Sequence, residues 1–501
     1  MLLFVERKGT MDDIIGRRGL VKSLAALGVT TRVGSPDLTA GEQQNRPQLD
    51  ASPGRLPFRG EFIVRNAYVL TMDPELGDIP DGDVHVRNGE IIAVGKQLKA
   101  PGAAVLDGHG MILLPGLIDT HWHMWTTFLR CMAGDRMEDG YFPLTTRYGQ
   151  AMSPLDMYHS TRLAAAEAIY SGLTTVGDNC HNVRSHDHAV ADLLALKEVG
   201  VRCRWSYGPF RGIQPGQRID LIDLERFHRD WANYSNEGLI SLGLMWGGMP
   251  DNSGFAHSTE IVDMARKEVE TGRRLGLPMC IHLAARENTP AGQIEAQVDF
   301  LGKDLLLIHA LAASKAEMKM VARAGSPISV SPGAELRIGY GLTKACDFMD
   351  AGIVVSVSVD NVSLTGNANF FAILKLLRNA ENAKAFNEFK ISARRVLEMG
   401  TIDGARALGI DHLVGSLKPG KRADLIMVMT NRINMGVFTD PTHMLVEATE
   451  EADVDTVVID GRILKRDGKF TALVPEQVIA AAAASLHAVG KRANALQSGI
   501  T

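Results

Sequence analysis

The 501-residue sequence has few cysteines, no long apolar run and little excess of either charge. Its five cysteines are scattered and form no CxxC pair, which argues against a disulfide framework and against a cysteine zinc site. No segment approaches the roughly 18 continuous apolar residues of a membrane span. With 58 acidic against 53 basic residues, the net charge of −5 gives no reason to expect a nucleic-acid partner. Hydrophobic residues at 45% then indicate a large soluble protein, and most simply an enzyme.

The first 60 residues lack the pattern of a folded core. Arg17 and Arg18 precede a weakly apolar run over 23–29, an order that resembles a twin-arginine export signal. The run is short, Arg32 interrupts its end, and no A-x-A cleavage site follows. We therefore expect residues 1–60 to form an N-terminal extension. The protein would be cytoplasmic or, as the alternative, exported through this signal-like segment.

Short β-type runs flank the middle of the chain on both sides. Residues 62–70 before it and 454–462 after it are examples, and Asn-Gly and Gly-Asp pairs separate such runs as hairpin turns do. We expect the two flanks, 61–113 and 413–474, to form one small β-sandwich. Residues 475–501 are rich in alanine and should add a C-terminal helix and tail.

The middle of the chain, residues 114–412, alternates short β-branched runs with longer helical patterns. One helix is expected over 153–171, because Ser153 and Pro154 supply an N-cap and a proline in the first turn. Eight alternations over about 300 residues favour an α/β fold with a (β/α)8 barrel over an open sheet. The eight runs begin at Leu117, Thr174, Val201, Ile240, Met279, Leu305, Ile328 and Val354.

Metal-type residues occupy the ends of several runs, which is where a barrel of this kind carries its chemistry. The first run ends in a His121-x-His123 pair, the fifth in His282, the sixth in His309 and the eighth in Asp360. Because alternate side chains of a strand share a face, the paired histidines point the same way. Neutral imidazoles with one carboxylate are the usual ligands of Zn²⁺ or Fe²⁺ with an open water position.

These motifs together resemble the amidohydrolase superfamily, in its cytosine-deaminase and chlorohydrolase-like branch. The resemblance rests on residues 115–123, on His282, His309 and Asp360, and on residues 415–425. The last stretch is similar to the segment in which members of the family return from the barrel to the β-sandwich. The resemblance spans residues from about 61 to about 470 and implies an enzyme that depends on a metal ion.

Roles for individual residues follow from the resemblance. One divalent metal ion, Zn²⁺ in the first place and Fe²⁺ as the alternative, would be held by His121, His123, His282 and Asp360. The ion would supply hydroxide at neutral pH, Asp360 would accept the proton of the water, and His309 would hydrogen-bond the hydroxide or the developing oxyanion. The fourth run, 242–246, carries no lysine, so the carboxylated lysine of two-metal members has no candidate.

One position departs from the branch. Its deaminases place a glutamate three residues after the fifth-strand histidine, where the glutamate shuttles a proton to the ring nitrogen, and this sequence has Ala285 there. Glu287 and Glu335 are alternative acids, or carboxylates without a role. If neither acts, the leaving group must be protonated through Asp360 or His309. That route favours hydrolysis of an amide, lactam or urea over deamination of an aromatic ring.

Two further residues are candidates for contact with a substrate. His181 follows the second run and Trp125 lies in the loop after the first, although each could equally serve packing. An apolar mouth with few fixed charges indicates a neutral cyclic or aromatic small molecule. We predict a metal-dependent hydrolase of a C–N bond. The alternatives are deamination or hydrolytic dechlorination of an N-heterocycle and, more remotely, a non-catalytic scaffold. A homodimer is one option for its assembly.

Overall fold

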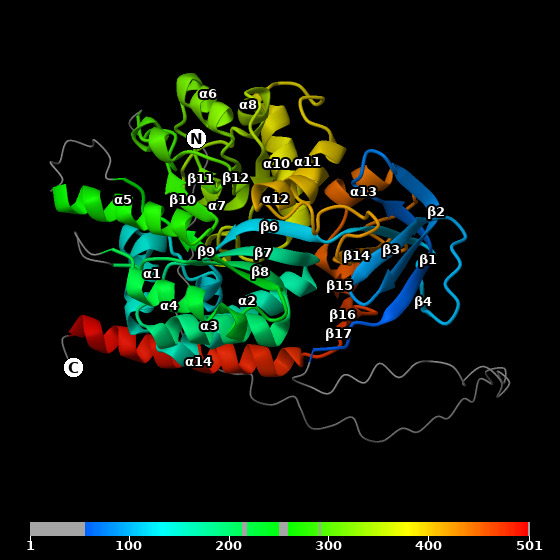
Figure 1. Ribbon diagram of the computed structural model, residues 1–501, viewed down its shortest axis with the longest axis horizontal. Coiled ribbons are helices and arrows are strands. Elements are labelled where there is room, and N and C mark those ends of the chain that lie inside the picture. Colours follow the sequence, from blue (N-terminus) through cyan, green and yellow to red (C-terminus); the bar gives the residue numbers. More distant parts are fainter. Residues whose placement is uncertain (1–55, 213–217, 250–258, 290–291, 499–501) are drawn as a thin grey trace, which may run out of the picture. The chain divides into compact units, whose positions relative to one another are not determined.

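The computed structural model describes residues 56–212, 218–249, 259–289 and 292–498. The expected N-terminal extension lies, apart from its last residues, outside the described residues, and so does its twin-arginine-like pattern. The described chain folds as a barrel of parallel strands surrounded by helices, to which a mixed β-sheet is joined (Figure 1). Among the helices described, none is both long and apolar enough to cross a membrane.

Eight parallel strands form the barrel sheet in sequence order, and each begins within one residue of a predicted run. This confirms the predicted fold. Most of their side chains are buried, because helices cover the outside and side chains fill the inside. The strands are β6 (Leu117–Trp122), β7 (Leu173–Cys180), β8 (Arg202–Tyr207), β9 (Ile240–Met245), β10 (Met279–Leu283), β11 (Leu305–His309), β12 (Ile328–Val330) and β13 (Val355–Val357).

The barrel closes between its first and last strands through residues of the predicted site. The Asp360 backbone N–H donates to the His121 carbonyl at 2.9 Å, and the His123 N–H donates to the Asp360 carbonyl at 2.7 Å. Asp360 and His309 have φ angles of 65° and 71°. Such backbone costs about 1 kcal/mol or more in a non-glycine residue and is concentrated at functional sites. Closure therefore fixes Asp360 beside the two histidines.

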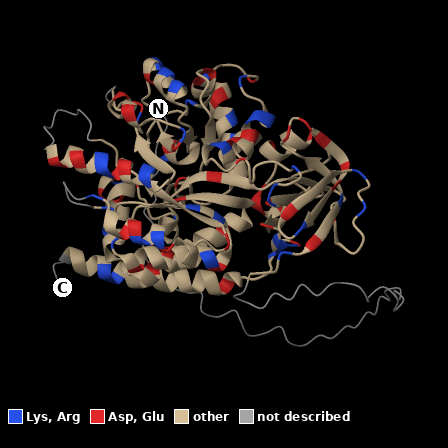
Figure 2. Ribbon diagram, in the orientation of Figure 1, with Lys and Arg blue, Asp and Glu red and all other residues tan. Residues whose placement is uncertain are grey.

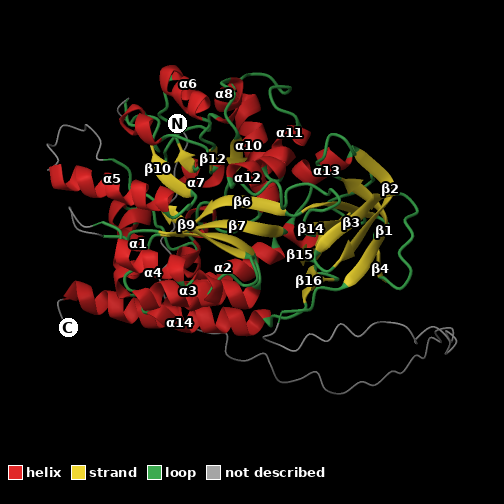
Figure 3. Cartoon of the chain, viewed as in Figure 1, coloured by secondary structure: helices red, strands yellow, loops and turns green. Residues whose placement is uncertain are grey.

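Helix α2 begins where its capping residues predict. The Ser153 N–H donates to the Asp156 carboxylate at 2.8 Å, and Pro154 occupies the first turn of α2. Helix α14 packs on α1 and α2 (Figure 3). The longer helices are α1 (Tyr141–Ala151), α2 (Pro154–Tyr170), α3 (His186–Val199), α4 (Leu221–Arg229), α5 (Thr259–Arg274), α6 (Lys315–Ala324), α10 (Phe370–Lys384) and α14 (Pro475–Ser498).

Shorter helices connect the later strands and the second sheet. In the view of Figure 2, acidic and basic residues are interspersed along the outer helices. The short helices are α7 (Pro332–Arg337), α8 (Ala345–Asp350), α9 (Val362–Thr365), α11 (Ala393–Met399), α12 (Ile402–Ala407), α13 (Pro441–Glu447) and the 3₁₀ helices η1 (Met124–Leu129), η2 (Met137–Asp139), η3 (Trp231–Asn233), η4 (Glu295–Phe300) and η5 (Glu451–Asp453).

The second sheet combines strands from both flanks of the barrel in one β domain, as the sequence predicts. The flanks meet where β5 pairs antiparallel with β14, with Leu114 opposite Ile426. The nine strands are β1 (Glu61–Leu70), β2 (Asp78–Arg87), β3 (Glu90–Gly95), β4 (Ala104–Asp107), β5 (Met111–Pro115), β14 (Leu425–Met429), β15 (Val454–Ile459), β16 (Arg462–Arg466) and β17 (Lys469–Phe470).

Buried ion pairs connect the β domain to the barrel. Arg202 of β8 donates to the Asp424 carboxylate at 2.7 and 2.9 Å. Nearby, the Asp460 carboxylate accepts from Arg59 at 2.7 Å and from Arg422 at 2.6 Å. Burial alone would raise the pKa of Asp460, but the arginine hydrogen bonds outweigh it and lower that pKa.

Candidate metal and active site

Imidazoles and one carboxylate converge at the C-terminal end of the barrel. Nε2 of His121 lies 3.1 Å from Oδ1 of Asp360 and 3.2 Å from Nε2 of His282. Nε2 of His123 lies 3.5 Å from the same Asp360 oxygen. His309 joins the group, with its ring centre 5.6 Å from that of His282. The structure thus brings together all five residues that the sequence places at strand ends.

The spacing of these ligand atoms fits a divalent metal ion. Two ring nitrogens that face each other at 3.2 Å repel unless a proton or a cation lies between them. Zn–N bonds in tetrahedral geometry put neighbouring ligand atoms about 3.3 Å apart. Three imidazole nitrogens and one carboxylate oxygen are also the donor set that borderline divalent ions prefer.

The pKa directions of these residues also favour a metal site. Burial lowers the pKa of His121, His123 and His282, and the neighbouring imidazoles lower that of His123 and His282 further. Burial would raise the pKa of Asp360, but its hydrogen bond with His121 outweighs burial and lowers that pKa. These directions favour neutral rings at His121, His123 and His282 and an ionised carboxylate at Asp360, which is the charge state that binds a metal.

Hydrogen bonds behind the cluster orient two of its rings. Nδ1–H of His123 donates to the Asn179 carbonyl at 2.9 Å, so the lone pair of Nε2 faces the cluster. Nδ1 of His309 lies 3.0 Å from Oε1 of Glu335, which also accepts from the Ser331 N–H at 2.8 Å. Burial alone would lower the pKa of His309, but its hydrogen bond with Glu335 and the nearby Asp360 carboxylate outweigh burial, so that pKa is raised. Glu335 thus holds His309 from behind.

A cavity of about 260 Å³ opens over the cluster. Two of its residues, Ala285 and His181, are ones that the sequence singles out. No sequence signal marks four other lining residues, because they lie on helix α1 or on loops where no spacing rule applies. These four are Tyr141, Phe142, Arg211 and Tyr340.

The remaining sequence candidates lie outside the lining of this cavity. Glu287 is exposed, and its backbone N–H donates to the Tyr340 carbonyl at 2.8 Å. Trp125 is fully buried in η1, where its Nε1–H donates to Nδ1 of His181 at 2.9 Å. Among the described lining residues, Asp360 is the only carboxylic acid.

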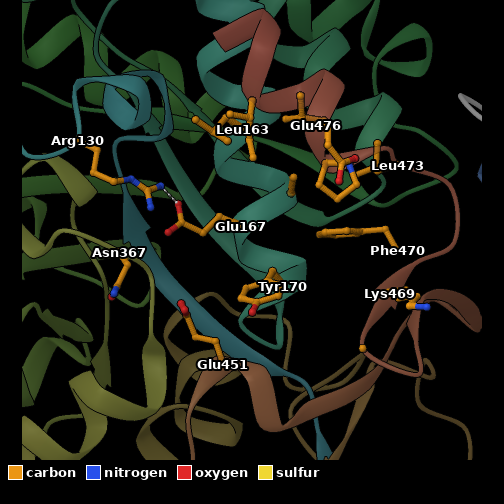
Figure 4. Close-up of a pocket in the computed structure, with 15 residues that line it drawn as sticks. Arg130, Leu163, Glu167, Tyr170, Asn367, Glu451, Lys469, Phe470, Leu473 and Glu476 are labelled. Carbon is orange, nitrogen blue, oxygen red and sulfur yellow. Dashed lines mark hydrogen bonds and ion pairs between the residues drawn. The ribbon is translucent and has the colours of Figure 1, made fainter. Parts of the chain in front are cut away.

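A larger cavity of about 920 Å³ lies away from the cluster, between α2, β17 and the start of α14 (Figure 4). Figure 4 shows apolar side chains such as Leu163, Phe470 and Leu473 around it, with an Arg130–Glu167 ion pair at one end. The described residues that line it include no histidine. Size alone would make this cavity the candidate active site. The smaller cavity is the better candidate, because it opens over the residues that can hold a metal ion.

Fold and site together define a metal-dependent hydrolase barrel. The family model described as Amidohydrolase family matches residues 112–464, and the chain belongs to this family. It is 27% identical over 451 residues to a 5'-deoxyadenosine deaminase of Methanosarcina barkeri, covering 87% of this chain and 100% of that protein. It is 25% identical over 429 residues to a 5-methylthioadenosine/S-adenosylhomocysteine deaminase of Acetivibrio thermocellus, covering 83% and 96%.

Solved structures show the same fold. An adenosine deaminase from Xanthomonas campestris with bound zinc has a TM-score of 0.74 at 20% identity, covering 86% of this chain and 99% of the other. Atrazine chlorohydrolase from Arthrobacter aurescens, complexed with zinc, has a TM-score of 0.72 at 20% identity, covering 85% and 100%. The family match and the deaminase relatives confirm a hydrolase that acts on C–N bonds, and the histidine-rich group in the barrel supports a divalent metal ion.

Proposed function

We propose that the chain hydrolyses the C–N bond of a neutral cyclic small molecule of the amide, lactam or urea type. The observation that carries this proposal is Ala285, which lines the cavity where deaminases of the branch place a glutamate. Without that glutamate, proton delivery to an aromatic ring nitrogen has no carboxylic acid other than Asp360 among the described lining residues. An amide nitrogen needs only one proton as it leaves a tetrahedral carbon.

In this proposal His121, His123, His282 and Asp360 hold one divalent ion, with Zn²⁺ preferred to Fe²⁺. The bound ion supplies Lewis-acid activation of a water molecule. The Asp360 carboxylate accepts the proton of that water and passes it to the leaving nitrogen as the C–N bond breaks and a C–O bond forms. His309, held by Glu335, donates to the developing oxyanion.

The second candidate is deamination of an adenosine-like nucleoside. It is favoured by the 5'-deoxyadenosine deaminases, which match 84% or more of this chain. Hydrolytic dechlorination of an N-heterocycle, the activity named for the Arthrobacter structure, would use the same attack on a ring carbon.

A product assay separates these candidates. Zinc-loaded protein is incubated with lactams, cyclic ureas, 5'-deoxyadenosine and a chloro-triazine, with Asp360→Asn as the inactive control. Addition of water without ammonia supports the first candidate, ammonia the second and chloride the third. Ala285→Glu should raise ammonia release if the cavity is otherwise of the deaminase kind. No turnover of any compound by folded, metal-loaded protein contradicts all three.

The preference for Zn²⁺ and the homodimer remain predictions. Turnover after loading with Zn²⁺ or with Fe²⁺ under anaerobic conditions tests the first. Light scattering of the full chain tests the second, because a dimer doubles the mass of 54.3 kDa.

A further inference from the structure

His181 stands beside the metal cluster without being one of its predicted ligands. It follows strand β7 and lines the cavity, and its ring centre lies 3.8 Å from that of His123. Its Nε2 is buried and has no hydrogen-bond partner among the described residues. A buried polar nitrogen without a partner is uncommon in a folded protein, because leaving it unpaired costs free energy.

Trp125 determines which nitrogen of His181 carries the proton. An indole N–H can only donate, and Nε1 of Trp125 lies 2.9 Å from Nδ1 of His181. Nδ1 must therefore accept, which places the proton of the neutral ring on Nε2. The Asn179 carbonyl is also near Nδ1, but at 3.4 Å it competes weakly. If Nδ1 of His181 carried the proton, its N–H would point at the N–H of Trp125, and the two would repel.

The same part of the cavity holds a second donor. Arg211 lines it, and the backbone N–H of Arg211 donates to the His181 carbonyl at 3.0 Å. Nε of Arg211 is buried and, like Nε2 of His181, has no hydrogen-bond partner among the described residues. Two donors without acceptors that line one cavity are satisfied by a ligand that brings acceptor atoms.

We propose that Trp125 is a positioning residue that holds His181 in its Nε2–H tautomer, and that this N–H donates to a carbonyl oxygen or ring nitrogen of the substrate. The second half rests on the proposed function, because it takes the cavity as the substrate site. The first half concerns the resting protein and can be tested without a substrate. Trp125 itself touches no reacting atom.

Nitrogen NMR of the zinc-loaded full chain tests the tautomer. With ¹⁵N-labelled histidine, the His181 signals are identified as those lost in His181→Phe. We expect a proton on Nε2 and none on Nδ1 in the parent, and a mixture of both tautomers in Trp125→Phe. Trp205→Phe is the matched control, because it removes a buried indole hydrogen bond, to Asp192, outside the cavity. A proton on Nδ1 in the parent, or an unchanged tautomer in Trp125→Phe, overturns the proposal.

Kinetics with any compound that the product assay identifies as a substrate test whether His181 donates to it. Trp125→Phe should lower kcat/KM about tenfold, the effect of one hydrogen bond, and should lower it no further in a His181→Phe background. Additive losses would show that Trp125 acts through packing alone. Should Trp125→Phe fail to fold, His181→Gln takes its place, because its amide N–H restores a donor and should retain more kcat/KM than His181→Phe. Equal losses in these two variants overturn the role of the donor.

Discussion

The metal end of the cavity and the part of its lining that lies on a helix and on loops are built differently. The cluster of His121, His123, His282, His309 and Asp360 stands on the ends of barrel strands, held by backbone hydrogen bonds and barrel closure. Tyr141, Arg211 and Tyr340 come instead from helix α1 and from loops after β8 and α7. The strand ends hold the metal-binding residues rigidly. Substitutions in the helix and loop part of the lining can therefore alter which substrate binds without disturbing the metal site.

Asp360→Asn should have the largest effect, because it removes the proton acceptor at the metal end of the cavity. An amide cannot accept the proton of the attacking water, so we expect kcat to fall by about 10³-fold or more. Circular dichroism and thermal unfolding should remain close to the parent, because an amide preserves the shape of the side chain. Metal content measured on the same sample separates lost chemistry from lost metal. A kcat within tenfold of the parent would contradict the role of Asp360.

Glu335→Gln tests the support behind His309. Partners of this kind typically affect activity by about 10- to 100-fold, and we expect a loss in that range. Because Glu335 raises the pKa of His309, its removal should lower that pKa. The limb of the pH profile of kcat/KM that belongs to His309 should then move to lower pH. An unchanged profile would mean that Glu335 serves packing only.

Arg211→Gln tests the loop-built lining. Losing this cation should weaken substrate binding about tenfold, mainly through KM, because the side chain lies outside the metal cluster. Metal content should stay at the parent value. A loss of metal together with activity would show that the two parts of the cavity are not separable.

Asp460→Asn is the control at the junction of the two sheets, where the effect on kcat/KM should be smallest. Removing a buried charge from its arginine partners should lower the free energy of unfolding by about 3 kcal/mol at neutral pH. Because the pKa of Asp460 is lowered in the fold, its stabilising effect is full above the ordinary carboxyl pKa. It is lost as the pH falls through the lowered value. Urea unfolding at several pH values should show the difference between parent and variant shrinking in acid.

The sequence predicts the metal end far better than the rest of the cavity. Strand ends recur at regular intervals and histidines there are conspicuous, so His121, His282 and Asp360 could be placed before the structure was known. Arg211 lies on a loop without periodicity, and nothing local marks it. Glu335 could be named but its role could not, because its contact with His309 depends on two strand ends becoming neighbours in the barrel.

The most direct test of the account is the metal content of the purified chain, compared with that of a His121→Ala/His123→Ala variant. We expect about one zinc or iron per folded parent chain and little in the variant, since removing two of four ligands leaves too few donors. Both proteins should be shown to be folded in the same buffer. A folded parent that contains no metal, and takes up no added Zn²⁺, Fe²⁺ or Mn²⁺, would contradict the metal site and the hydrolase mechanism built on it.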